Sequence, residues 1–113
     1  MSVNTNYTAN PQNINRVALS GATAETVVAA VSDRSYMLIG FWFANPTGSS
    51  VNCELYVNDG TNDLLIWHQS VAANTTTAED RIVFRVQSGH SIKAKGAASV
   101  VACVLLGQTL QVG

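Results

Sequence analysis

Residues 51–60, VNCELYVNDG, decide the fold of this chain, because apolar residues recur at every second position and then stop at a turn. The apolar positions, which lie on one side of an extended chain, are Val51, Cys53, Leu55 and Val57. The NDG sequence at 58–60 is a strong hairpin signal, since Asn and Gly accept the positive φ of tight turns. Similar alternation returns at 82–86 and 91–95, and short alternating strands between turns are typical of an antiparallel sandwich or barrel.

Strand-like segments follow one another along the whole chain, separated by turn residues. We expect strands at residues 16–19, 24–31, 34–43, 51–58, 64–69, 80–86, 90–95, 98–106 and 109–112. Residues 71–79, VAANTTTAE, lack an apolar period and are expected to form a polar loop, and the segments 90–95 and 98–106 are expected to pair as a hairpin about Lys95-Gly96. The Ala content of 24–31 also permits one helical turn, but its Val pair favours a strand. The sequence thus predicts an all-β chain, with one antiparallel β-sandwich of eight or nine short strands over residues 15–113.

The segment 34–43 is apolar on both of its faces. One face would carry Met37, Ile39, Phe41 and Phe43, and the other would carry Tyr36, Leu38, Gly40 and Trp42. A strand of this kind is either central in a sandwich or covered by a partner. We expect Trp42 to be a core residue, while core and surface remain open for Trp67.

Residues 1–14, MSVNTNYTANPQNI, are rich in Asn and Thr and have no apolar period, which predicts an extended or flexible N-terminal arm. The segment is either a frayed terminus or an arm that becomes ordered on a neighbouring subunit, for example by adding a strand to a sheet edge.

Composition narrows the classes of function. Apolar residues make up 47% of the 113 residues and charged residues 12%, about half of the ~25% usual in globular proteins. A surface with so few charges suits a subunit covered by neighbours, although an uncharged monomer is the equal alternative. The net charge of −1 leaves no basic stripe for nucleic acid, and no apolar run approaches the ~20 residues of a membrane helix. The N-terminus has no basic start or apolar core of a secretory signal, so we expect synthesis in the cytoplasm.

No residue pattern points to catalysis, a metal or a cofactor. The two histidines, His68 and His90, are not part of a nucleophile motif, and Cys53 and Cys103 lie 50 residues apart without a zinc-type spacing. In a reducing compartment the two cysteines are expected to be buried small hydrophobes. Residues 58–63, NDGTND, are rich in oxygen ligands but lack the closing glutamate of an EF-hand calcium loop. We therefore expect a protein that is not an enzyme and holds no metal or cofactor.

Several short motifs occur in an order that resembles a known class of proteins. The motifs are IGF at 39–41, AN at 44–45, LYVNDG at 55–60, VAAN at 71–74 and SGHSIKA at 88–94. In this order the chain resembles small β-sandwich virion proteins of tailed bacteriophages, especially capsid decoration (cement) proteins and related tail modules. The resemblance implies a jelly-roll-like sandwich that assembles on a particle and carries no active site. It transfers no individual binding residue.

Two hypotheses of function follow. The first is a decoration subunit on the capsid exterior, made in the bacterial host cytoplasm, which binds the major capsid protein or other virion proteins and also itself as a dimer or trimer. Its contact residues would be Val3, Asn4, Tyr7, Asn13, Ile14 and Trp67. The second is a carbohydrate-binding module of a phage tail or fibre, which would use Trp67, Tyr56 and residues 58–63. Neither hypothesis involves nucleic acid or a membrane.

Overall fold

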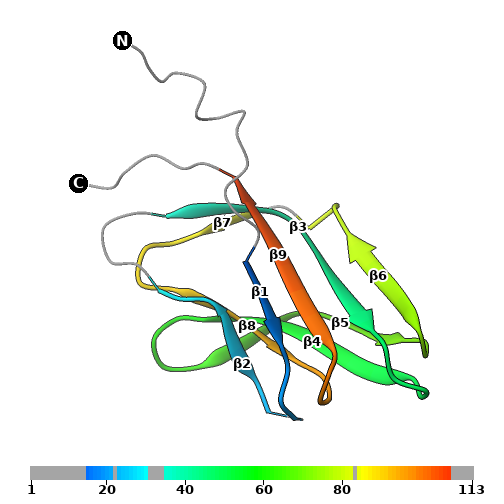
Figure 1. The fold of residues 1–113 in the computed structure, drawn as a ribbon. Coiled ribbons are helices and arrows are strands. Elements are labelled where there is room, and N and C mark those ends of the chain that lie inside the picture. The colour runs from blue at the N-terminus through cyan, green and yellow to red at the C-terminus, as the bar shows by residue number, and fades with distance from the viewer. Residues whose placement is uncertain (1–14, 22, 31–34, 83, 108–113) are drawn as a thin grey trace.

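A computed structural model describes residues 15–21, 23–30, 35–82 and 84–107, and these residues form nine strands and no helix (Figure 1). The strands are β1 (Asn15–Ala18), β2 (Glu25–Val28), β3 (Tyr36–Asn45), β4 (Val51–Asn58), β5 (Asp63–Val71), β6 (Thr75–Glu79), β7 (Phe84–Val86), β8 (Ser91–Lys95) and β9 (Val101–Gly107). The predicted all-β class is confirmed. Because the described part has no helix, it also has no helix that could span a membrane. The strand expected at 109–112 lies outside the described residues.

The strands form two antiparallel sheets that pack face to face. Sheet A has the order β1-β9-β3-β6, with β7 also paired to β3, and sheet B has the order β2-β8-β4-β5. The strand pairs are nested along the chain: β1 with β9, β2 with β8, β3 with β6 and β7, and β4 with β5. Folding such a nested ribbon over into two sheets gives the jelly-roll topology, and the predicted sandwich is confirmed (Figure 1).

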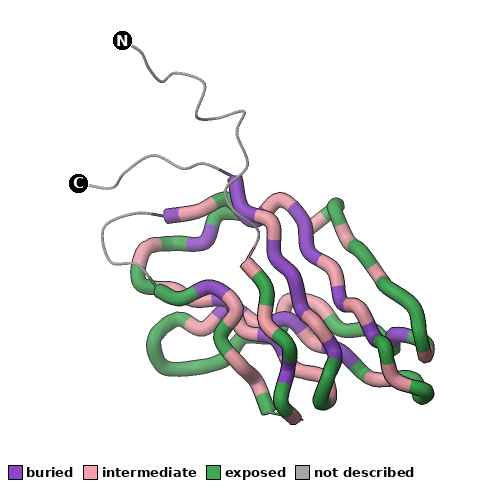
Figure 2. Tube along the Cα trace, in the orientation of Figure 1, coloured by how far each residue is buried: buried purple, intermediate pink, exposed green. Residues whose placement is uncertain are grey.

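The core lies between the sheets and is built from the inward residues of both (Figure 2). Its buried members are Leu19, Val28, Leu38, Phe41, Phe43, Cys53, Leu55, Val71, Val86, Ile92, Ala94, Val100, Ala102, Val104 and Leu106. The alternation predicted for β4 is confirmed, because Cys53, Leu55 and Val57 are all buried and the residues between them are not. The hairpin predicted at 58–63 joins β4 to β5, with Asn58 opposite Asp63.

Strand β3 is central in sheet A, but its expected alternation is wrong. The pairing of β3 with β9 shifts between Leu38 and Gly40, so that the inward series runs Leu38, Phe41, Phe43. An irregularity of this kind inserts one extra residue and changes which face the following side chains occupy. Trp42 consequently lies on the outer face, half-buried, and the prediction that it belongs to the core is wrong.

The polar segment that we expected to be a loop, residues 71–79, contains strand β6. Residues Phe41 to Asn45 of β3 pair in register with Glu79 to Thr75 of β6. The strand lacks an apolar period because it lies at the edge of sheet A, where Thr76 and Ala78 face solvent and Thr77 is only half-buried. Thr has a high strand propensity, which was the available signal.

The expected final hairpin is also wrong, because its two strands belong to different sheets. Strand β8 pairs with β2 and β4 in sheet B, whereas β9 pairs with β1 and β3 in sheet A. The connection crosses between the layers and is held in the core by Val100, which is fully buried and accepts a hydrogen bond of 2.8 Å from the backbone N–H of Leu19. Alternation predicts strands, but it does not say which sheet a strand joins.

Candidate functional site

The outer face of sheet A is apolar. Residues directly opposite one another in an antiparallel pair share a face. The register therefore places Arg16, Cys103, Trp42 and Ala78 in one row across the sheet, on the side away from the core. The apolar residues of this side, which we call the apolar face, are Ala18, Met37, Ile39, Trp42, Ala44, Ala78, Val101, Cys103, Leu105 and Gly107.

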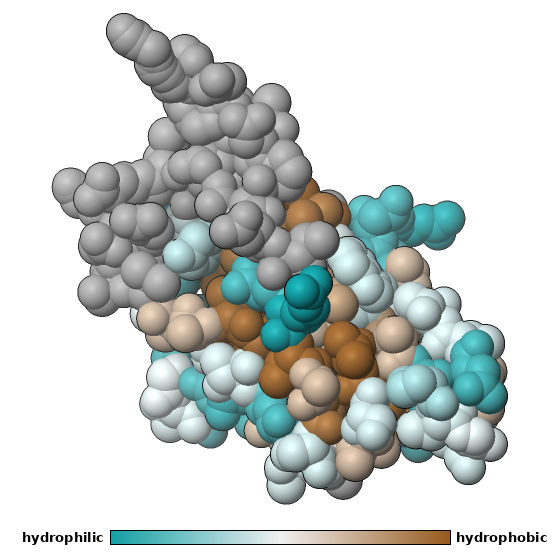
Figure 3. Space-filling model, viewed as in Figure 1, coloured by the Kyte–Doolittle hydropathy of each residue, from teal (hydrophilic) through white to brown (hydrophobic). Residues whose placement is uncertain are grey.

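Charge is confined to the margins of the apolar face. Among the residues that the structure describes, its only charged side chains are Arg16 on the edge strand β1 and Arg85 on the edge strand β7. Apolar side chains gather on this side of the molecule over β9 and β3, with some strongly hydrophilic atoms among them (Figure 3). Met37 has 36% of its surface exposed, and Trp42, Val101 and Leu105 are half-buried. An apolar centre with a charged rim is typical of a surface that contacts another protein.

The outer face of sheet B has the opposite character, and we call it the polar face. Glu54 lies between Lys95 and His68 across the strands, and Tyr56 lies between Lys93 and Leu65. Lys95 pairs with Glu54 at 3.8 Å, and Lys93 pairs with Asp63 at 3.7 Å. Charged pairs of this kind are typical of a surface that is exposed to solvent. The two outer faces of one sandwich therefore differ sharply in polarity.

Tyr56 is held on the polar face by a hydrogen bond that its hydroxyl donates to the carboxylate of Glu54. This bond, helped by partial burial and by the negative charges of Glu54 and Asp63, raises the pKa of Tyr56 to about 12. The hydroxyl therefore stays protonated at all physiological pH values and serves as a donor.

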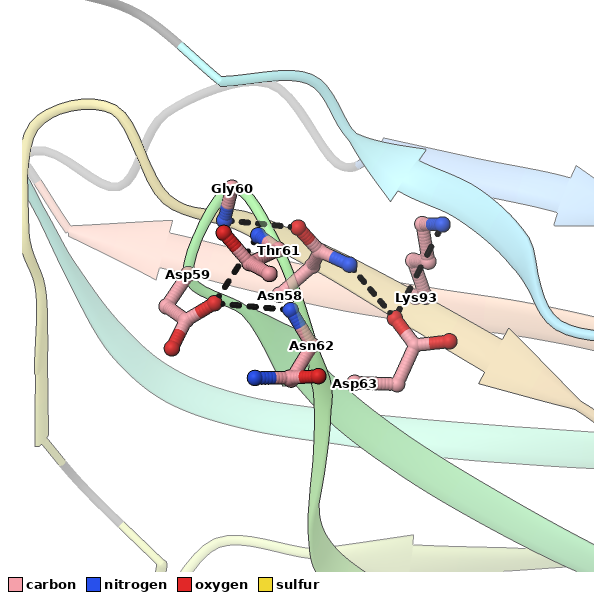
Figure 4. Close-up of polar contacts among 7 residues, drawn as sticks. All are labelled: Asn58, Asp59, Gly60, Thr61, Asn62, Asp63 and Lys93. Carbon is pink, nitrogen blue, oxygen red and sulfur yellow. Dashed lines mark hydrogen bonds and ion pairs between the residues drawn. The ribbon is translucent and has the colours of Figure 1, made fainter.

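The loop at residues 58–63 uses its oxygen atoms to stabilise its own turn (Figure 4). One carboxylate oxygen of Asp59 accepts hydrogen bonds from the backbone N–H groups of Asn62 and Thr61, at 2.8 and 3.0 Å, which lowers the pKa of Asp59. The side-chain oxygen of Asn58 accepts from the N–H of Gly60 at 2.8 Å, where the backbone φ is +100°. The described residues include no group of three or more His, Cys, Asp or Glu that could hold a metal ion. The oxygen-rich sequence is accounted for by turn formation.

Asn45 forms a polar corner that the sequence pattern did not single out. Its side chain is buried, and its amide nitrogen donates to the carbonyl oxygens of Ser49 at 2.8 Å and Val71 at 3.0 Å. Its oxygen accepts from the N–H and the hydroxyl of Thr47, at 3.0 and 2.7 Å. Val71 ends β5 in sheet B, so this amide ties the two sheets together. The AN motif could have signalled a turn cap, but the contact with Val71 spans 26 residues and is visible only in the fold.

The predicted contact residues fall in two groups. Trp67 is half-buried and packs against the core, where its ring stacks on Phe43 with centroids 5.3 Å apart and meets the edge of Phe41 at 5.1 Å. Core packing accounts for these contacts, and its role at an interface stays a prediction. The other five residues, Val3, Asn4, Tyr7, Asn13 and Ile14, lie outside the described residues.

Both cysteines are free and buried, as predicted. Burial raises the pKa of Cys53 to about 11 and also raises that of Cys103. The nearby positive charge of Arg16 opposes the second shift only in part. Neither thiol is poised as a nucleophile.

Two open hollows lie at loop ends of the described part. One, of about 320 Å³, is lined by Ser35, Arg85, Gln87 and Ser88, and its main contact is a 2.9 Å hydrogen bond from Arg85 to the hydroxyl of Ser35. The other, of about 240 Å³, lies beside Asn45 and Thr75. Neither brings together a nucleophile and a base.

Comparison with known proteins gives no family. No family model matches the chain, and no curated protein sequence matches it. A crystal structure of a cycloisomaltooligosaccharide glucanotransferase from Paenibacillus sp., complexed with cycloisomaltoheptaose, is similar over 77% of this chain at 16% identity, with a TM-score of 0.29. The chain spans 12% of the length of that enzyme chain. A likeness at this level supports no conclusion about activity or ligand.

Proposed function

We propose that this chain is a non-enzymatic structural protein of a tailed-phage virion, a decoration (cement) subunit that binds the outside of the head shell and stabilises it through protein–protein contacts. The observation that carries the proposal is the apolar face, which offers a broad apolar surface whose charged residues lie on its edge strands. Fold alone does not determine function, so the class of particle comes from the sequence resemblance. The partners would be the major capsid protein or other virion proteins, together with further copies of the chain.

The physical demands on a cement subunit agree with the two unlike faces. Such a subunit must bury apolar area against its neighbours while its remaining surface stays in water. The apolar face meets the first demand, and the polar face, with its pairs Lys95–Glu54 and Lys93–Asp63, meets the second. The jelly roll also keeps most backbone groups inside its two sheets, which limits unwanted pairing in a protein present in many copies.

A carbohydrate-binding role in a tail or fibre is the second candidate, but the structure removes part of the surface on which it was based. A sugar ring would have to stack on the face of an aromatic side chain, and the ring of Trp67 is already stacked on Phe43. Tyr56 remains on the polar face beside residues 58–63, so a weak sugar site there would have to use Tyr56. A glycan array separates the two roles, because a cement subunit gives no saturable sugar signal.

Particle binding tests the proposal directly. Purified chain is mixed with phage heads that lack it, and the bound fraction is measured after sedimentation, together with the temperature at which the heads release DNA. We expect saturable binding and a higher release temperature. Deleting residues 1–14 should reduce binding while the β-sheet circular dichroism stays unchanged, if these residues form the contact arm. Absence of saturable binding to any head preparation from phages that encode the chain would refute the role.

A further inference from the structure

The apolar face exposes hydrophobic side chains to solvent, and we propose that it is buried against the same face of a second copy of this chain. Self-association through this face is a property of the free protein and does not depend on the proposed virion role, because the purified protein alone tests it. On a head shell, a neighbouring virion protein would replace the second copy on this face. Two features of the face, its shape and its area, favour a second copy as its occupant, and the placement of its charges favours one arrangement of the two copies.

The shape of the face matches another sheet. Sheets that pack face to face lie about 10 Å apart and interdigitate aliphatic side chains of moderate size. The centre of the apolar face is largely of this kind, with Val101 and Leu105 on β9 and Ala44 on β3. Beside them lie the larger ring of Trp42 and the buried Cys103. The outer side of sheet A therefore resembles its inner side, which already packs against sheet B.

The area of the face reaches what a specific dimer needs. Four strands about 4.8 Å apart, with about 3.4 Å per residue over the seven residues of β9, span about 19 by 24 Å, or roughly 450 Å². Side-chain relief adds to this flat footprint, so two copies bury on the order of 1,000 Å², the lower bound for a specific interface. Interfaces at this lower bound are typically weak and transient, so we expect a reversible dimer with a dissociation constant on the order of 10⁻⁶ M or higher.

The charges favour one arrangement of the two copies. A two-fold axis that lies between the sheets and runs along the strands places β1 of one copy over β6 of the other, and β9 over β3. Arg16 is level with Ala78 across sheet A, because both belong to the row that contains Cys103 and Trp42. In the dimer Arg16 therefore lies over the exposed Ala78 of the second copy. The Arg16 side chains of the two copies then lie at opposite edges of the interface, so these like charges do not face each other.

Sedimentation velocity from about 1 to 200 µM protein tests the proposal, since this range brackets a micromolar constant. We expect the wild type to pass from monomer to dimer. Trp42→Glu, which places a charge in the centre of the face, should raise the dissociation constant at least about tenfold. The matched control is Leu65→Glu, the same kind of change at a residue 50% exposed on the polar face, and it should leave the constant unchanged.

Ala78 provides a second pair of variants that folds safely, because this residue is exposed on an edge strand. Ala78→Arg should weaken the dimer, since the new charge meets Arg16 of the second copy, whereas Ala78→Glu should keep or tighten it. Equal weakening by both variants would overturn the two-fold arrangement. A wild type that stays monomeric throughout would overturn the proposal, and dimerisation that appears only after deletion of residues 1–14 would reassign the cover to those residues. Dissociation by Leu65→Glu but not by Trp42→Glu would overturn it in favour of the β5 edge.

Discussion

Replacing Asn45 by alanine is expected to destabilise the sandwich by about 3 kcal/mol. The substitution removes the donor to Val71 and the acceptor for the Thr47 N–H, both at 3.0 Å, and neither has another side-chain partner at this corner. Losing the partner of a buried polar group costs about 1–3 kcal/mol, so two such losses cost about 2–4 kcal/mol. The other three contacts, with Ser49, Ala72 and the Thr47 hydroxyl, cost less. The Thr47 hydroxyl also donates to the Ser49 carbonyl at 2.9 Å, and the Thr75 hydroxyl donates to the Ala72 carbonyl at 2.7 Å. A loss of this size is a large part of the ~5–15 kcal/mol that stabilises a typical domain.

Urea unfolding followed by tryptophan fluorescence measures this loss at fixed protein concentration, since self-association would shift the midpoint. With a slope of about 1.5 kcal/mol per M, a loss of 3 kcal/mol lowers the midpoint by about 2 M. Asn52→Ala is the matched control, because Asn52 is exposed on the polar face and should cost less than about 0.5 kcal/mol. A loss below about 1 kcal/mol for Asn45→Ala would refute the idea that this amide ties the sheets together.

Three further outcomes are expected. In an NMR pH series the Asp59 carboxyl of the folded protein should titrate below its ordinary pKa of 3.8. Its contribution to stability is therefore present above pH 3.8 and is lost as the pH falls through the folded pKa. A midpoint at or above 3.8 would contradict the turn geometry. At pH 8 the Cys53 thiol, with a pKa of about 11, should react with an aromatic disulfide reagent about 100-fold more slowly in the folded than in the unfolded chain, and Cys103 should also be slowed. Phe43→Ala should cost about 3–5 kcal/mol and shift the emission of Trp67 to longer wavelength, whereas an unchanged spectrum would mean that the two rings do not stack in solution.

Local pattern was sufficient to predict the strands whose environment is regular. Strand β4 alternates without interruption because one side faces the core and the other faces water along its whole length. The hairpin at 58–63 follows from Asn and Gly at the positions where a tight turn needs them. Both features depend on residues that are close together in the chain, so the local sequence is enough to predict them.

Features that depend on distant partners could not be predicted in the same way. The irregularity near Gly40 changes which face Trp42 occupies. An isolated Gly inside a strand is a local signal of a bulge, but whether a bulge forms there depends on the pairing with Leu105 on another strand. Strand β6 is polar since it is an edge strand, and whether a strand is at an edge is a property of the topology. The sequence shows the polarity of β6 and the two-sided apolar character of β3, but the strand order of sheet A explains both features.

The apolar face has its own sequence signal. The run 34–43 is apolar on both sides, and a strand of this kind was expected to be either central or covered by a partner. In the fold β3 is central, and its outward side is apolar as well, so the two alternatives are not exclusive. The low proportion of charged residues fits the same interpretation, because the described charges gather on the polar face and at the rims rather than across both surfaces.

An electron cryo-microscopy map of virions that contain this chain tests the central claim most directly, because it shows both the particle and the contacts of each sheet. The account predicts jelly-roll density on the outside of the head shell, with the outer face of sheet A buried against protein and the outer face of sheet B open to solvent. Density in which the outer face of sheet A is bare and the outer face of sheet B makes the contacts, or virions without this chain on the shell, would contradict it.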